Sequence, residues 1–276
     1  AGSGTLHKFD FLTFLNYCLN FTTFMMGPIQ RYDDYYNQWH GVTKAIPNTL
    51  ESHIDSAIRI LVGLVKAYIL AAWIQPYALL PGINIEEMTI AEMFISIYAF
   101  YFFLFLNFSG YCDVVIGVGS FFGVRPPENF NKPYLARNAS DFWLRQHRSL
   151  TLWLTDYVFS PLYKRTLTSQ SIFAKPFVAF NVSLMVTMIV SGFWHGTTFA
   201  FLFFGLSHGI FLVIYHSWNT FLTNAYGKKW VKKWRQNWFV YAGGVFLTFN
   251  STALAFVFFN LSWDEAFIFF GRLLGL

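Results

Sequence analysis

Charge is what this sequence has least of. Asp, Glu, Lys and Arg make up 12% of the 276 residues, whereas soluble domains carry about 25%. Residues 176–227 contain none of these four types, and apolar residues account for 55% of the chain. One membrane crossing takes roughly 20 apolar residues, so this uncharged stretch is long enough for two. The sequence therefore predicts an all-α, polytopic helical membrane protein.

Other absences narrow the function. The two cysteines, Cys18 and Cys112, lie in apolar stretches and fit neither a disulfide framework nor a metal-binding knuckle. There is no nucleophile elbow, no phosphate-binding or dinucleotide-binding loop, and no zinc-protease motif. Hydrolase, ATPase and metalloprotease interpretations have no support, and we expect no metal site. No basic n-region or small-residue cleavage site marks a signal peptide, and the opening Ala-Gly-Ser-Gly is typical of a linker or a cut end. We expect a single domain over 1–276 that is a fragment of a larger helical fold.

The apolar segments predict about six spans plus one amphipathic or re-entrant helix. The segments are 9–29, 54–80, 90–123 with a break at Ser109-Gly110, two within 176–227, and 240–261. Cytoplasmic loops carry the excess of Lys and Arg. This rule places the basic stretches 125–165 and 228–235 inside, and the loops 81–89 and 262–266 outside. Because the same rule explains the basic stretches, we expect no nucleic-acid partner.

A histidine lies near the middle of the uncharged stretch. His195 is part of Ser-Gly-Phe-Trp-His-Gly at residues 191–196. Ionisable side chains within a membrane are expensive and usually line a cavity or a proton pathway. The alternative is a neutral histidine that bonds a carbonyl group across helices, and residue type alone leaves both open.

A second histidine lies on a basic, aromatic segment. Residues from Asp141 onward predict one amphipathic helix that ends near Pro161. On it His147 shares a face with Trp143, Leu150, Thr151 and Leu154, while Arg145 lies on another edge. An anchoring helix whose histidine merely lies at the membrane boundary is an equally open interpretation. Asp113, in an apolar segment, is expected to pair with a basic residue of 125–148 and to act structurally.

Six motifs follow one another along nearly the whole chain. They are Gly-Pro-Ile-Gln-Arg-Tyr at 27–32, Phe-Ser-Gly-Tyr-Cys-Asp at 108–113, Pro-Glu-Asn-Phe-Asn-Lys-Pro-Tyr at 127–134, Phe-Trp-Leu-Arg-Gln-His-Arg-Ser-Leu at 142–150, Gly-Phe-Trp-His-Gly at 192–196 and Leu-Ser-His-Gly at 206–209. In this order they resemble the membrane-bound O-acyltransferase family. The groups most similar are bacterial proteins that O-acetylate alginate and related exopolysaccharides, and the D-alanyl transfer proteins of teichoic acids.

The resemblance implies a helical membrane fold with a funnel or tunnel through a thin centre. The family's invariant histidine corresponds to His195, which we interpret as the general base. The second histidine corresponds to His147, which would orient the acyl thioester or donate to its carbonyl group. Trp194 and Asn131 are candidate substrate-binding walls. His208 is expected to serve in packing or helix–helix bonding, and Arg145 to support the structure.

The implied reaction moves an acyl group, acetyl by preference, from a thioester to a hydroxyl group of a periplasmic or extracellular polysaccharide. The donor would be acetyl-CoA or an acyl carrier on the cytoplasmic side, with no bound cofactor, and partner acetyltransferase proteins are candidates for handing on the acyl group. D-Alanyl transfer to teichoic acid is the alternative. At 160–165 the chain has Ser-Pro-Leu-Tyr-Lys-Arg, where the alginate group commonly has Pro-Leu-Gly-Gly. In this segment the chain resembles the D-alanyl group more closely.

Two interpretations from other classes stay open. A transporter or export component for a lipid-linked acyl or glycosyl group also fits intramembrane histidines, although no inverted repeat supports it. A scaffold that only recruits partners would carry inert histidines. In every case the expected location is the bacterial inner membrane, in contact with membrane lipid.

Overall fold

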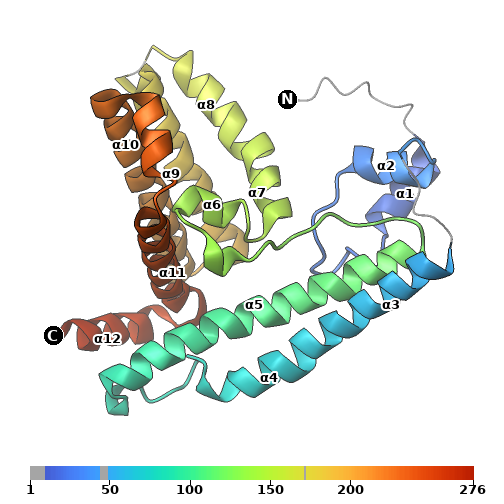
Figure 1. The fold of residues 1–276 in the computed structure, drawn as a ribbon, viewed down its shortest axis with the longest axis horizontal. Helices are drawn as coiled ribbons and strands as arrows, with labels where there is room; N and C mark the ends of the chain where they lie inside the picture. The colour runs from blue at the N-terminus through green and yellow to red at the C-terminus, as the bar shows by residue number, and fades with distance from the viewer. Residues whose placement is uncertain (1–9, 44–48, 171) are drawn as a thin grey trace. The chain divides into compact units, whose positions relative to one another are not determined.

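The structure is a computed structural model, and it describes residues 10–43, 49–170 and 172–276. Across these residues every regular element is a helix, which confirms the all-α prediction (Figure 1). The chain divides into two compact units. The first comprises residues up to Pro76, Phe102–Asn131 and His147–Leu150, and the second comprises Tyr77–Tyr101, Lys132–Gln146 and Thr151–Leu276.

Five helical segments among the described residues are long and apolar enough to cross a membrane. They are Leu50–Tyr77, α5 (Ile90–Phe121), α9 (Pro176–His195), α10 (Phe199–Trp234) and α11 (Trp238–Asn260). The first is continuous through α3 (Leu50–Leu64), the π-helical η1 (Val65–Leu70), α4 (Ala71–Ile74) and the 3-10 turn η2 (Gln75–Tyr77). The chain is therefore a polytopic helical membrane protein.

The sequence predicts a span at 9–29, but the described residues 10–29 do not form one long helix. Within them the only helix is α1 (Phe11–Cys18), and α2 (Tyr32–Trp39) follows. The Oδ1 atom of Asn20 accepts hydrogen bonds from the backbone N–H and the hydroxyl group of Thr22. Such local side-chain bonds compete with helix formation, and Gly27-Pro28 then prevents its resumption.

In the first unit α3 lies against the second half of α5. A Cβ atom on Gly110 would come within 2.6 Å of the carbonyl oxygen of Gly63, so these two helices touch backbone to backbone. The break expected at Ser109-Gly110 is wrong, because α5 is continuous there. Because Gly110 has no side chain, the two helices are able to pack closely, as membrane helices commonly do at small residues.

In the second unit α9 and α10 form a hairpin, and α11 packs against α10 (Figure 1). Pro176 occupies the first turn of α9, where its missing N–H needs no partner. A Cβ atom on Gly192 would collide with the carbonyl oxygen of Phe201, and one on Gly205 with that of Met188. The two backbones are therefore in direct contact. The last helix, α12 (Trp263–Leu274), begins with a capping box of Ser262 and Glu265.

The single amphipathic helix expected from Asp141 to about Pro161 is also wrong. The chain instead forms α6 (Ala139–Trp143), α7 (Arg148–Leu154), the π-helical η5 (Thr155–Phe159) and α8 (Ser160–Leu167). Between α6 and α7 it turns through His147, which has φ +47°. Left-handed backbone of this kind ends a helix and is uncommon for a residue other than glycine. The remaining 3-10 turns are η3 (Ile85–Glu87), η4 (Pro133–Leu135) and η6 (Ile172–Ala174).

Candidate active site

His195 is the last residue of α9 and lies among aromatic rings of the second unit. Its ring centroid is 4.8 Å from that of Trp194 and 4.9 Å from that of Phe259, both edge-on. Phe204 at 5.6 Å and Phe201 at 6.3 Å complete the surroundings. Three helical elements therefore position the imidazole, because Phe201 and Phe204 come from α10 and Phe259 from α11.

The ring nitrogens of His195 make no hydrogen bond to any residue that the structure describes, and the side chain is partly exposed. His216 on α10 differs, because its Nδ1 atom lies 2.9 Å from Oδ1 of Asn181 on α9. His216 thus makes an interhelical bond of the kind that the sequence left open for His195. A neutral imidazole without a protein partner is able to accept a proton from a hydroxyl group.

The two candidate wall residues are both at the surface of their units. Trp194 is 55% exposed beside His195. Asn131 is also exposed, but it belongs to the first unit, whereas Trp194 belongs to the second. Their shared part in one substrate site stays a prediction.

His208 is buried and packs against aromatic rings of the second unit. It is 1% exposed, stacks on Phe142 with ring centroids 5.7 Å apart, and meets Phe204 at 4.7 Å and Trp143 at 5.1 Å edge-on. Within the described part of the chain its Nε2 atom has no hydrogen-bond partner. The packing expected for His208 is present, and no helix–helix bond is found at that atom.

His147, in the first unit, is buried with its ring 5.0 Å from Phe108. Asn129, which is 1% exposed, holds the backbone that follows His147. The carbonyl oxygen of Asn129 accepts the backbone N–H of Arg148 at 2.9 Å, and its Oδ1 accepts the N–H of Ser149 at 3.0 Å and the hydroxyl group of Ser149 at 2.9 Å. These hydrogen bonds stabilise the backbone turn at His147.

The same network joins motifs that are far apart in sequence. The backbone N–H of Ile29 donates to Oγ of Ser149 at 2.9 Å, and Nδ2 of Asn129 lies 3.6 Å from Sγ of Cys112. Sequence reasoning did not single out Asn129 or Ser149 as positioning residues. The available signal was that both belong to the six motifs, next to residues that were singled out.

Arg145 pairs with a carboxylate of the preceding helix. Its Nε atom lies 2.8 Å from Oδ1 of Asp141, and Oδ1 of Asn138 accepts the N–H of Asp141 at 2.9 Å to cap α6. This arrangement closes the segment that leads to the turn, in line with a supporting role for Arg145.

Asp113 is paired as expected, but its partners are not those predicted. Its Oδ2 atom lies 2.6 Å from Nζ of Lys66, and its Oδ1 atom lies 3.0 Å from Nη2 of Arg59. Arg59 also binds Glu128, at 2.6 Å and 2.5 Å. The partners thus come from the α3–η1 helix rather than from 125–148, because the contact of Gly63 with Gly110 brings these two helices together one turn away. Hydrogen bonds from Arg59 hold the pKa of the Glu128 carboxyl below its ordinary value of 4.5.

The described residues contain no group of three His, Cys, Asp or Glu side chains that could hold a metal ion.

Comparison with known proteins identifies the family. Residues 2–263 match the model of the membrane-bound O-acyltransferase family. The chain belongs to the membrane-bound O-acyltransferase family. Both imidazoles and the network around Asn129 lie within the matched residues.

Relatives within this family differ in the polymer that their names mention. The chain is 31% identical over 268 residues to a teichoic acid D-alanyltransferase of Streptococcus thermophilus, covering 93% of this chain and 63% of that protein. It is 30% identical over 194 residues to a probable alginate O-acetylase of Azotobacter vinelandii, with 70% and 36% covered. It is 28% identical over 213 residues to a peptidoglycan O-acetyltransferase of Helicobacter pylori, with 77% and 38% covered. The chain thus spans between about a third and two thirds of the length of these relatives.

Proposed function

We propose that the protein to which this chain belongs is an O-acyltransferase that transfers an acyl group from a thioester to a hydroxyl group of a cell-envelope polymer. The observation that carries the proposal is the position of His195, a half-buried residue that ends α9 among aromatic rings and whose ring nitrogens have no hydrogen-bond partner in the described residues. Membership of an acyltransferase family supports it, as do the acyl-transfer names of the relatives.

In the proposed mechanism His195 acts as the general base. A ring nitrogen accepts the proton of the acceptor hydroxyl group as that oxygen attacks the thioester carbonyl carbon. The carbon–sulfur bond then breaks, and the departing thiolate takes the proton from the imidazolium. Ester and free thiol are the products, so atoms and charges balance.

The developing oxyanion needs donors that are already in place. The first N–H groups of α10 are candidates, since the cap residue Thr198 makes no side-chain hydrogen bond to them. They follow His195 by four to six residues. In this proposal His147 orients the thioester or donates to its carbonyl group, while Trp194 and Asn131 form walls of the substrate site.

The proposal also specifies which acyl group is transferred. Two teichoic acid D-alanyltransferases, from S. thermophilus and Bacillus subtilis, match over 93% and 89% of this chain, whereas the A. vinelandii alginate O-acetylase matches over 70%. This coverage favours D-alanyl transfer to teichoic acid. Acetyl transfer to a polysaccharide, which the sequence placed first, is the second candidate.

The proposal also assigns sides of the membrane. A thioester donor, acetyl-CoA or an acylated carrier, approaches from the cytoplasm, and the polymer acceptor lies outside, with partner acetyltransferase proteins as candidates for the acetyl reaction. The bacterial inner membrane fits both requirements. The excess of Lys and Arg at 125–165 and 228–235 supports the orientation.

The test compares turnover per folded molecule of the full-length protein in reconstituted membranes, with a labelled thioester donor. His195→Gln keeps a similar shape but loses the base, so its turnover is expected to fall about 10²–10⁴-fold. His216→Gln is the matched control, because an amide is able to keep the bond to Asn181. Near-normal turnover of His195→Gln would overturn the assignment.

The role of His147 is tested in the same assay. His147→Ala is expected to raise KM for the donor more than it lowers kcat, because orientation is easier to replace than proton removal. A change confined to KM of the acceptor would contradict this role.

A further inference from the structure

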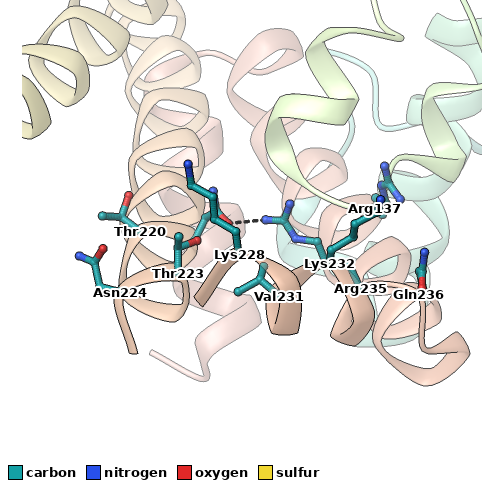
Figure 2. A pocket seen from close by; sticks show the side chains of 10 residues that line it. Arg137, Thr220, Thr223, Asn224, Lys228, Val231, Lys232, Arg235 and Gln236 are labelled. Carbon is teal, nitrogen blue, oxygen red and sulfur yellow. Dashed lines mark hydrogen bonds between the residues drawn. The ribbon is translucent and has the colours of Figure 1, made fainter. Parts of the chain in front are cut away.

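A basic groove of about 620 Å³ lies in the second unit, along the C-terminal part of α10 (Figure 2). Four cationic side chains line it, namely Arg137, Lys228, Lys232 and Arg235, and no Asp or Glu is among its lining residues. Cations gathered in a groove repel one another unless an anion binds between them. The groove is thus suited to a negatively charged ligand.

A break in α10 and a close contact with α11 position the charged residues of the groove. Gly227 has φ +80° and interrupts α10, so that the lysines follow a change of chain direction. Lys228 and Lys232 are four residues apart and share one helix face. On the other side, a Cβ atom on Gly244 would lie 2.6 Å from the carbonyl oxygen of Arg137, so α11 fixes the backbone of Arg137 at close range.

One arginine of the groove, Arg235, is held by neutral groups. Nη2 of Arg235 donates to Oδ1 of Asn219 at 2.6 Å, the dashed line in Figure 2, and to the hydroxyl oxygen of Tyr215 at 3.1 Å. Arg137 is 3.9 Å from Asp141, but that carboxylate has a nearer partner in Arg145, at 2.8 Å. The charge of Arg235 is therefore oriented without being neutralised, while Arg137 shares the Asp141 carboxylate with Arg145.

Neutral hydrogen-bond donors line another side of the groove. Figure 2 shows Thr220, Thr223 and Asn224 at one end and Arg137 at the other, with Lys228 between them. Hydroxyl, amide, ammonium and guanidinium donors around one space suit the several oxygens of a phosphate group, which guanidinium groups bind in bidentate fashion.

Exposed aromatic side chains place the groove at the edge of the membrane. Trp218, Tyr226, Trp230 and Trp238 are between 42% and 69% exposed. Tyr226 stacks on Trp230 with ring centroids 4.5 Å apart. Trp and Tyr are enriched where the hydrocarbon meets the headgroups. These rings lie in the same stretch of chain as the groove, on both sides of Gly227, which favours a groove that opens at headgroup depth.

We propose that this groove binds the phosphate headgroup of an anionic membrane lipid. Basic pockets at the cytoplasmic ends of membrane helices recognise such headgroups. A lipid phosphate arrives at the required depth already concentrated in the bilayer, whereas a soluble phosphate compound does not. The binding concerns a site separate from His195 and does not depend on the proposed acyl transfer.

Two double variants of the full-length protein separate site binding from general attraction. Lys228→Gln with Lys232→Gln removes two charges that line the groove. Lys229→Gln with Lys233→Gln removes two charges from the neighbouring positions, which are exposed and do not line it. Both variants have the same net charge. Binding is measured by titrating phosphatidylglycerol into protein in detergent, with the retained lipid counted by native mass spectrometry and the thermal shift recorded.

We expect phosphatidylglycerol to bind the wild type and the Lys229/Lys233 variant alike, and to bind the Lys228/Lys232 variant on the order of tenfold more weakly. Phosphatidylcholine and soluble glycerol phosphate, added at the same concentration, should give no shift. Equal weakening in both variants would overturn the proposal, because it would show general attraction to a basic surface. A shift with glycerol phosphate as large as with the lipid would overturn it as well, since the site would then take a soluble phosphate.

Discussion

Nζ of Lys66 lies 2.6 Å from Oδ2 of Asp113, an ion pair between two helices that are each apolar enough to cross a membrane. Asp113→Asn would leave Lys66 and Arg59 close together without a carboxylate between them. Breaking a largely buried pair on one side typically destabilises by roughly 3 kcal/mol. We expect less folded protein in the membrane and earlier thermal unfolding, with nearly unchanged turnover per folded molecule.

Asp264→Asn is the control, because Asp264 is exposed in the first turn of α12. The measurements are the yield of monodisperse protein and its melting temperature. A normal yield of Asp113→Asn with low specific activity would show that Asp113 acts in the chemistry instead.

The contact of Gly192 with Phe201 predicts a second effect. A methyl group at residue 192 would collide with the backbone of α10 and push the two helices apart three residues before His195. Overpacking of this kind commonly destabilises by about 1–3 kcal/mol. Gly192→Ala should therefore lower both the melting temperature and the turnover.

Gly243→Ala on α11 is the matched substitution, since a Cβ atom there has nothing within 4 Å. Alanine favours helix more than glycine does, so this variant should be as stable as the wild type or more so. If both alanine variants melt at the same temperature, the close approach does not matter.

The ion pair of Glu128 with Arg59 predicts a pH dependence outside the spans. Since the folded pKa of Glu128 is lowered from 4.5, the pair's contribution to stability is present above that value and is lost as pH falls through the folded pKa. Glu128→Gln should melt earlier than the wild type at pH 7, and the difference should shrink on acidification. Glu86→Gln, at an exposed position in η3, should not change the pH profile. A constant difference between Glu128→Gln and the wild type at every pH would contradict the assignment.

The arrangement of spans predicts the sides of two loops. Two candidate spans, α5 and α9, together with the part of α10 before Gly227, separate Glu87 from Lys232. Reporter fusions after these residues should therefore report opposite sides of the membrane, with Lys232 in the cytoplasm. Two fusions on the same side would refute this topology.

Composition was enough to predict the parts of the fold that the bilayer dictates. The uncharged stretch 176–227 predicted two crossings, and α9 and α10 occupy it, with His195 at the turn between them. Hydropathy also located the helices that became α5 and α11. These features depend on transfer from water to hydrocarbon, which a single chain segment expresses by itself.

Features that depend on distant partners were not predictable. The turn at His147 is held by Asn129, eighteen residues earlier, through bonds to Arg148 and Ser149. No periodicity within 141–161 contains that information. Likewise Gly110 looked like a break because the glycine that it packs against, Gly63, lies in another helix. The partners of Asp113 were missed for the same reason.

The shortness of the connection between α9 and α10 has a consequence for biosynthesis. Gly196, Thr197 and Thr198 are the residues between the two helices, while Lys175 precedes α9 and Lys228 follows the break in α10. Inserting a charged side chain into the bilayer is costly, and residues 176–227 contain none. The pair is therefore able to leave the translocon as one hairpin, anchored by a lysine at each end. His195 then reaches its depth in the bilayer as that hairpin inserts, before the following helix has been made to pack against it.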